Sequence, residues 1–220
     1  MVQLGRQVET WEQQDILWQV QVHKQLLLEL VVFIPPASNA TEEYDGSTWS
    51  PGGNLGTARY YITGCGTQTA GLAFGGQIGP GNSYKNNTEE YDGSAWTVGG
   101  NLNTGRISSG GAGIQTAGLA FGGGIPGGQT AATESYNGTS WTSVNSMNTA
   151  RSLLAGAGLQ TAALGFGGYA TVETGSTEQY DGTSWASALP MTTARQNLAG
   201  AGTQTAALGF GRRSTKSAAT

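Results

Sequence analysis

The chain has 220 residues, of which 37 are glycine and 11% are charged, with a single cysteine and a single histidine. This composition excludes a disulfide-stapled small protein, a metal cluster built from cysteine and histidine, and a coiled coil. Ten basic residues against 14 acidic ones give a net charge of −4, so no basic field attracts a nucleic-acid backbone and we expect no nucleic-acid partner.

Residues 1–33 share no repeat with the rest of the chain. They carry the only histidine, His23, and an apolar run, LLLELVVFI, that Glu29 interrupts. The run is too short to span a bilayer, and no basic stretch with a cleavage site marks a signal peptide. We therefore expect no membrane partner, although the composition also permits an amphipathic helix here.

The genetic code suggests another origin for this segment. With codons shifted by one frame, the residues from Trp18 onward can read as a run similar to 199–211, and the residues from Leu4 to Asp15 can read as 49–59. Our hypothesis is that residues 1–33 are an out-of-frame translation of an upstream unit, with the frame restored near Phe33.

Residues 34–220 consist of a repeat, with units at 41–87, 88–132, 133–176 and 177–220. Each unit has a Thr-Glu-x-Tyr-(Asp/Asn)-Gly motif, a tryptophan five residues after the tyrosine, an arginine ten residues later, and a phenylalanine fifteen residues after that. The repeated residues are Glu42, Tyr44, Trp49, Arg59, Phe74, Gly75 and Gly76; Glu89, Tyr91, Trp96, Arg106, Phe121, Gly122 and Gly123; Glu134, Tyr136, Trp141, Arg151, Phe166, Gly167 and Gly168; and Glu178, Tyr180, Trp185, Arg195 and Phe210.

Each unit predicts four short antiparallel strands. The glycine-rich run 151–168 has a turn in its middle, which indicates an inner hairpin. The tyrosine and tryptophan segments flank an Asp-Gly or Asn-Gly turn, which indicates a second hairpin. Four strands in roughly 45 residues, repeated without helices, are typical of a β-propeller blade.

The repeat predicts three complete four-stranded blades between Arg59 and Trp185. Residues 41–49 supply only the outer hairpin of an earlier blade, and 195–210 only the inner hairpin of a later one. The two halves either join to close a four-blade ring or remain the ends of an open arc, whose strand edges would favour self-association. Because residues 218–220 resemble 131–133, which directly precede Glu134, we expect the chain to be a fragment of a longer array.

These motifs resemble the kelch repeat, a family of β-propellers that includes the propeller of galactose oxidase. The resemblance rests on an arginine, a hydrophobic strand ending in Gly-Gly, a tyrosine and a tryptophan, as in Arg59, Gly75–Gly76, Tyr91 and Trp96. It covers residues 41–211 and implies a propeller fold. The Tyr-to-Trp interval is shorter than usual for the family, and Gly-Arg at 211–212 replaces the last Gly-Gly.

The repeated residues favour architecture over catalysis, because a catalytic site is a single constellation and these residues recur in every unit. We predict that the tyrosines and tryptophans pack between sheets and that the glutamates and arginines form structural ion pairs. The Asp-Gly turns partly resemble the Asp box of sialidases, which is itself a turn. A copper site like that of galactose oxidase would need histidine ligands and a cysteine-linked tyrosine, whereas Cys65 stands alone as a small residue expected to be buried. No catalytic residue, metal or cofactor is predicted.

The length differences between units fall in three stretches, 77–87, 124–132 and 169–176, which we predict to be loops. The glycine run 122–129 lacks the lysine and helix of a phosphate-binding loop. We expect a non-enzymatic binding or structural module that holds a protein or glycan in these loops. The glycine-rich arrays resemble those of phage tail-fibre and other virion proteins, which implies a virion or extracellular setting. The alternative is a fragment of a sialidase-like or galactose-oxidase-like carbohydrate-active enzyme whose catalytic residues lie outside this chain.

Overall fold

The computed structural model describes residues 37–79, 81 and 83–211. These residues belong to one compact unit. The segment 1–33, and with it the frame hypothesis, lies outside the described residues.

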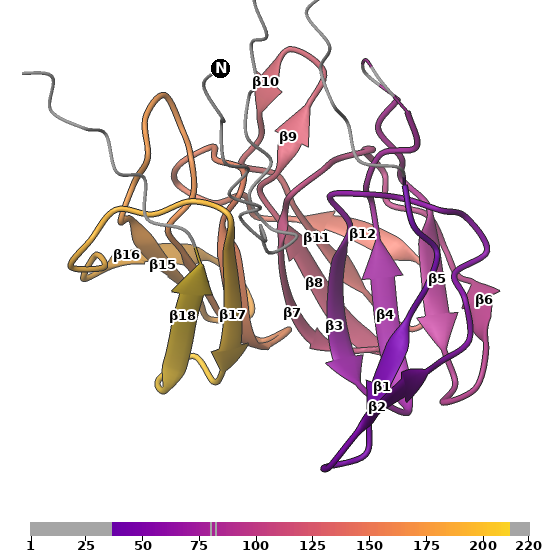
Figure 1. The fold of residues 1–220 in the computed structure, drawn as a ribbon. Coiled ribbons are helices and arrows are strands. Elements are labelled where there is room, and N and C mark those ends of the chain that lie inside the picture. Colours follow the sequence, from indigo (N-terminus) through magenta and orange to yellow (C-terminus); the bar gives the residue numbers. More distant parts are fainter. Residues whose placement is uncertain (1–36, 80, 82, 212–220) are drawn as a thin grey trace, which may run out of the picture. The chain divides into compact units, whose positions relative to one another are not determined.

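The described part of the chain contains strands and turns and no helix, and three of its sheets have four antiparallel strands each (Figure 1). The first sheet contains β3 (Thr63–Thr67), β4 (Ala70–Phe74), β5 (Thr88–Tyr91) and β6 (Trp96–Val98). The second contains β7 (Gly110–Ile114), β8 (Ala117–Phe121), β11 (Thr133–Tyr136) and β12 (Trp141–Val144). The third contains β13 (Ala155–Leu159), β14 (Ala162–Phe166), β15 (Thr177–Tyr180) and β16 (Trp185–Ala188). The predicted all-β class and four-stranded sheets are confirmed.

Two further hairpins stand alone at the two ends of the series of sheets. One is β1 (Glu42–Tyr44) with β2 (Trp49–Pro51), and the other is β17 (Leu198–Gly202) with β18 (Ala207–Gly211). They correspond to the outer and inner halves of a four-stranded sheet.

The Asp-Gly turns fix the outer hairpins. In the first complete sheet, Asp92 Oδ1 accepts the backbone N–H groups of Ser94 and Ala95, each at 2.8 Å, and Gly93 takes a φ of +93°. Asn137 replaces the aspartate once, and its Oδ1 accepts the N–H groups of Thr139 and Ser140 at 2.9 Å. A short oxygen acceptor followed by a left-handed glycine therefore suffices for this turn.

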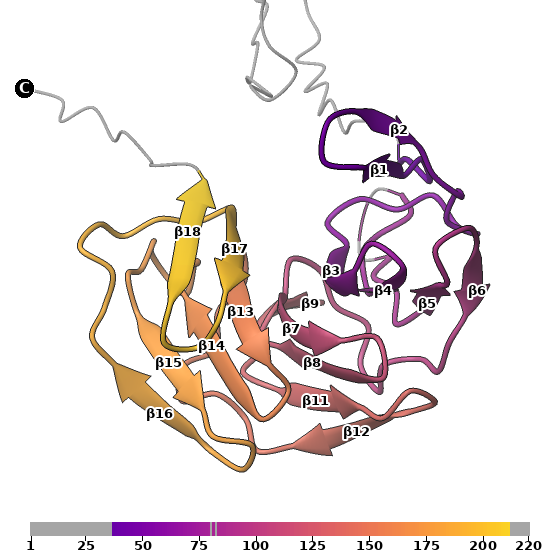
Figure 2. The ribbon, with the colours of Figure 1, turned by 90° about the horizontal axis from the view of Figure 1, so that it is seen from below.

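The inner strands of successive sheets lie side by side. Strand β7 contacts both β3 and β13, and β13 contacts β17 (Figure 2). Glycine permits this approach: a Cβ on Gly156 would lie 2.3 Å from the carbonyl oxygen of Gly111 in the neighbouring sheet. The sheets can therefore stack this closely only because the residues of the inner strands are small.

The core lies between the sheets rather than inside any one of them. Phe74 of β4 packs against Trp141 of the next sheet, with ring centroids 5.0 Å apart, and Phe121 packs against Trp185 at 4.9 Å. These aromatic side chains are almost fully buried. Each sheet therefore buries its apolar surface only when a neighbouring sheet is present.

One predicted loop has more structure than expected. Residues 124–132 contain a small hairpin, β9 (Gly124–Ile125) with β10 (Gly128–Gln129), so the prediction that 122–129 form only a loop is wrong in this part. Pairs of glycines hid the strands from the sequence pattern, since glycine has low strand propensity.

Gly156→Ala tests the close approach of the inner strands. We expect it to destabilise the protein by about 1–3 kcal/mol, because the added methyl group meets a backbone carbonyl that cannot move aside. Gly128→Ala is the matched control, since a Cβ there meets no atom within 4 Å. Urea unfolding measures both variants, and equal midpoints would contradict the argument.

The turns predict a specific response to acid. Backbone N–H donors lower the pKa values of Asp45, Asp92 and Asp181, since they favour the charged carboxylate. A lowered folded-state pKa gives stability that is present above the ordinary value of 3.8 and is lost as the pH falls through the folded-state value. Replacing all three residues by asparagine, as Asn137 does naturally, should flatten the decline in unfolding midpoint between about pH 5 and pH 2. An unchanged slope would show that the turns do not contribute to acid sensitivity.

Candidate binding face

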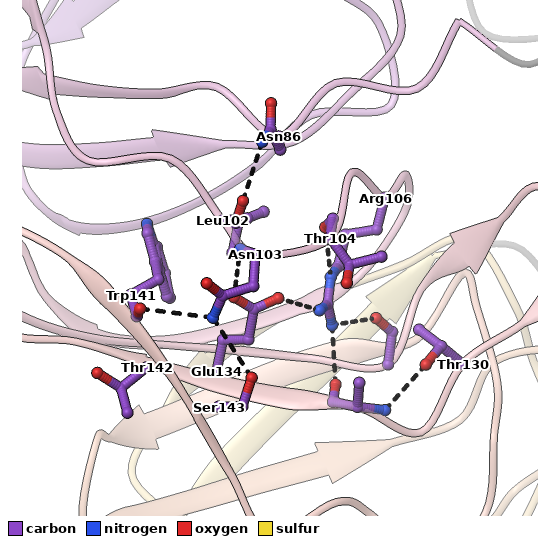
Figure 3. Close-up of polar contacts among 12 residues, drawn as sticks. Asn86, Leu102, Asn103, Thr104, Arg106, Thr130, Glu134, Trp141, Thr142 and Ser143 are labelled. Atoms are coloured by element: carbon purple, nitrogen blue, oxygen red, sulfur yellow. Dashed lines mark hydrogen bonds and ion pairs between the residues drawn. The ribbon is translucent and has the colours of Figure 1, made fainter.

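A buried ion pair joins the inner and outer hairpins of each complete sheet. Arg106 donates from Nη1 to the carbonyl oxygens of Gly122 and Ala132, at 3.1 and 2.8 Å, and from Nη2 to Glu134 Oε1 (Figure 3). The second oxygen of Glu134 accepts the N–H of Asn103 at 2.7 Å. Arginine and glutamate are each 1% exposed. The Arg106 side chain thus donates to backbone carbonyl oxygens and to Glu134, all of them groups of the protein.

The same pair occurs in the other two complete sheets. Arg59 pairs with Glu89 at 2.6 Å, and Arg151 pairs with Glu178 at 2.8 Å. Burial lowers the pKa of each of the three arginines, and the adjacent carboxylate acts in the opposite direction. Within the described residues, the side chain of Arg195 makes only a 3.4 Å bond to the carbonyl oxygen of Gly209 and has no carboxylate partner, and Glu42 is exposed.

The repeated aromatic residues join one sheet to the next. Trp141 donates from Nε1 to Thr88 Oγ1 of the preceding sheet at 2.9 Å, and Trp185 donates to Thr133 Oγ1 at 3.0 Å. The hydroxyl of Tyr136 donates to Glu90 of the preceding sheet. The indole N–H groups and the tyrosine hydroxyl therefore bond to acceptors within the protein.

The paired glycines after each phenylalanine also lie at junctions between units. Gly123 has a φ of +107°, and its N–H donates to the carbonyl oxygen of Arg151 at 2.9 Å. The same bond runs from Gly76 to Arg106 and from Gly168 to Arg195. The remaining glycines, Gly75, Gly122 and Gly167, also have positive φ.

A cavity of about 330 Å³ lies where the inner strands begin. Four residues at equivalent positions line it, each with a positive φ between 50° and 57°: Tyr61, Ser108, Leu153 and Asn197. Their backbones are linked in series, because the N–H groups of Ser108, Leu153 and Asn197 each donate to the carbonyl oxygen of the equivalent residue one unit earlier, at 2.8 to 3.0 Å. The strained conformation is therefore held by hydrogen bonds between units.

The variable loops begin at residues that line this cavity or are bridged to residues at or next to its lining. Bridges join Ile107 to Gly124 and Ser152 to Tyr169, which start the loops 124–132 and 169–176. A third bridge joins Tyr60 to Gln77, where the loop 77–87 starts. We call the cavity and these three loops the loop rim; the Asp-Gly turns lie at the other ends of the strands (Figure 1).

Tyrosines that do not belong to the repeat gather on the loop rim. Tyr60 and Tyr61 meet edge to face with ring centroids 5.0 Å apart. Burial raises the pKa of Tyr60, and the nearby hydroxyls of Tyr61 and Tyr84 raise it further. The equivalents of Tyr61 in the other units are serine, leucine and asparagine. The repeat pattern did not identify these residues; their departure from the repeat is the sequence signal that could have found them.

The described residues offer little for nucleophilic or metal chemistry. No group of three or more histidine, cysteine, aspartate or glutamate side chains among them could hold a metal ion. Cys65 is half-buried, and burial raises the pKa of its thiol to about 12, so the reactive thiolate is scarce at neutral pH. In residues 37–79, 81 and 83–211 there is also no helix with the length and hydropathy needed to cross a membrane.

No model of a known protein family matches the chain, and no curated protein matches its sequence.

Arg106 provides a test of the buried pair. We expect Arg106→Met to cost about 3–5 kcal/mol of unfolding free energy, because it leaves the Glu134 carboxylate buried without its partner. Arg106→Lys should fall between wild type and Arg106→Met, since lysine keeps the charge but lacks the planar fork that reaches two carbonyls and a carboxylate. Chemical denaturation compares the three proteins, and a lysine variant as stable as wild type would show that charge alone is required.

Proposed function

We propose that the chain is a non-enzymatic binding module of kelch-type β-propeller blades, and that its loop rim holds a glycan. The regular spacing of the repeat and the three four-stranded sheets support the kelch-type fold. The resemblance of the glycine-rich units to phage tail-fibre arrays supports a virion or extracellular setting.

The observation that carries the proposal is the separation of repeated and variable residues. The repeated arginines, glutamates and aromatics of the complete sheets are occupied by contacts within and between sheets. The residues that differ between units gather around one cavity instead. Variable loops on a rigid scaffold are the usual place for binding specificity.

The chemistry of the loop rim fits a polar, uncharged ligand with apolar faces. Tyr61 is 52% exposed and Ile78 is 42% exposed, so both offer apolar surface to a ligand. The side chain of Gln77 donates to the backbone carbonyl oxygens of Gly79 and Gly81, so these groups of the loop are already hydrogen-bonded. Tyrosine combines a flat apolar ring with a hydroxyl, which suits the alternating apolar and polar faces of a sugar.

A glycan array probed with the labelled full chain tests this function. We expect binding to neutral glycans that Tyr61→Ala weakens by about tenfold or more, as removal of an aromatic contact at the centre of an interface does. Ile114→Ala is the matched control, because Ile114 is 45% exposed and lies at the opposite ends of the strands.

Three results would contradict the proposal. Binding that Ile114→Ala reduces as much as Tyr61→Ala would place the ligand elsewhere. Release of sugar or oxidation of the bound glycan by the chain would instead favour the carbohydrate-active enzyme. If the chain bound no glycan but its loop rim captured a protein, the ligand would be a protein and not a glycan.

A further inference from the structure

The two terminal hairpins are complementary halves of one sheet. In each complete sheet, the second strand of the inner hairpin pairs with the first strand of the outer hairpin, as β4 with β5, β8 with β11 and β14 with β15. Strand β18 has no such outer strand among the described residues, and β1 has no such inner strand. Each hairpin therefore presents the edge that the other one lacks.

We propose that two copies of the chain associate head to tail, with β18 of one copy pairing with β1 of the other to complete a four-stranded sheet. The register follows from the complete sheets: Leu164 lies opposite Gln179, and Phe166 lies opposite Thr177. The equivalent partners at the junction are Leu208 with Glu43 and Phe210 with Thr41.

Charge supports this pairing. Each complete sheet has an arginine from the start of its inner hairpin bound to a glutamate of its outer hairpin. Arg195 is the arginine without a carboxylate, and Glu42 is the exposed glutamate at the matching position. In the junction Arg195 meets Glu42 of the second copy as Arg151 meets Glu178.

Apolar exposure at the two ends supports it as well. Phe210 is 54% exposed, whereas the equivalent Phe74 is fully buried under Trp141. Trp49 is 68% exposed, whereas Trp185 is 6% exposed. At the junction Phe210 packs on Trp96 of the second copy, in the way that Phe74 packs on Trp141.

A further polar group fits the same arrangement. The indole nitrogen of Trp96 is buried without a hydrogen-bond partner, whereas Trp141 and Trp185 both donate to a threonine of the preceding sheet. The threonine at that position is Thr41, whose Oγ1 donates to the carbonyl oxygen of Gly53. Pairing of β1 with a second copy would draw Thr41 into the strand register that Thr88 and Thr133 occupy.

A second copy fits better than closure within one chain. The β1–β2 hairpin is tied to the first complete sheet by Tyr91, whose hydroxyl donates to Glu43. The β17 strand is tied to the third, since Asn197 donates to the carbonyl oxygen of Leu153 at 3.0 Å. The three complete sheets follow one another along a curve, and Figure 2 shows β17–β18 and β1–β2 at its two ends, with no strand pairing between the two hairpins. Closure within one chain would have to move these hairpins away from the neighbours that hold them, whereas a second copy can pair with each hairpin where it lies.

The geometry of head-to-tail contact sets the size of the assembly. A heterologous interface gives a ring where the rotation closes and a filament where it does not. Two copies with two junctions form the smallest ring; each copy brings three complete sheets and each junction adds one, so the ring has eight. Eight lies at the upper end of the range of about four to eight blades that propellers use.

Disulfide trapping tests the junction in a Cys65→Ala background, because alanine occupies the equivalent positions 112, 157 and 201. One full-length protein carries Leu208→Cys and another carries Glu43→Cys, a position filled by serine and glutamine in later units. Mixing and oxidising the two should give a mixed disulfide dimer, because residues opposite each other on paired strands have Cβ atoms about 5 Å apart. Leu208→Cys mixed with Val98→Cys is the control and should remain uncrosslinked.

Sedimentation of the full chain supplies the second measurement. We expect reversible association that Arg195→Glu weakens by at least about tenfold, since it places two acidic groups together in the junction. Val98→Asp, at a residue that is 84% exposed, should leave association unchanged. Near-ultraviolet circular dichroism verifies that both variants keep their packed aromatic core.

Three outcomes would overturn the proposal. The first is a monomer at every concentration, which would mean that another segment or partner covers the ends. The second is an intrachain disulfide in a monomer carrying both Leu208→Cys and Glu43→Cys, which would show closure within one chain. The third is association that Arg195→Glu leaves intact, which would place the interface elsewhere.

Discussion

Glycine at the inner strands is the constraint on which the rest of the structure depends. The carbonyl oxygen of Gly111 lies so near Gly156 that no side chain fits between the two strands. The same holds at Gly200, where a Cβ would lie 2.5 Å from the carbonyl oxygen of Gly156. This backbone contact sets the spacing between sheets, and that spacing lets Phe74 and Phe121 reach the tryptophans of the next sheet. Glycine costs backbone entropy in a strand, and the buried aromatic contacts offset that cost.

The buried ion pair solves a second problem that the close stacking creates. A chain that turns sharply after each inner hairpin leaves carbonyl oxygens at the junction between hairpins, where water has little access. Arg106 donates to two of them, and Glu134 neutralises its charge while accepting a backbone N–H. Because these hydrogen bonds are made, the ion pair holds the two hairpins of a sheet in one register. Replacement by apolar groups would leave the carbonyl oxygens without donors.

The sequence predicted the sheets well because their determinants are local and periodic. The Asp-Gly turns and the fixed interval from Tyr91 to Trp96 define the outer hairpins, and the structure has a strand on each side of every such turn. The β9–β10 hairpin was missed because Gly124 and Gly128 carry no strand signal of their own. The left-handed backbone at Tyr61, Ser108 and Leu153 was missed for a different reason. It depends on hydrogen bonds between residues about 45 positions apart, which no local pattern encodes.

The candidate binding face was predicted only in outline. Length variation identified the three loops, but the cavity itself is lined by Tyr61, Ser108, Leu153 and Asn197, one residue from each unit, which only the stacking of separate units brings together.

Repetition itself explains why the loop rim and the two outlying hairpins, β1–β2 and β17–β18, differ from the complete sheets. In a stack of identical units, any residue that contacts both neighbours must suit every junction, so its identity is fixed by architecture. The loops are less constrained: 169–176 differs in sequence from 124–132, and their contacts to the following unit, such as those of Gly175 with Met191 and of Ala131 with Met147, use backbone groups that any residue supplies. The ends meet the architectural requirement on one side only. The same residues that are buried in the middle, such as Phe121, are therefore exposed at the ends, as Phe210 is, and remain chemically suited to a further unit. The variable loops and the exposed apolar residues of the two outlying hairpins thus both follow from a single property, the dependence of each sheet on its neighbours.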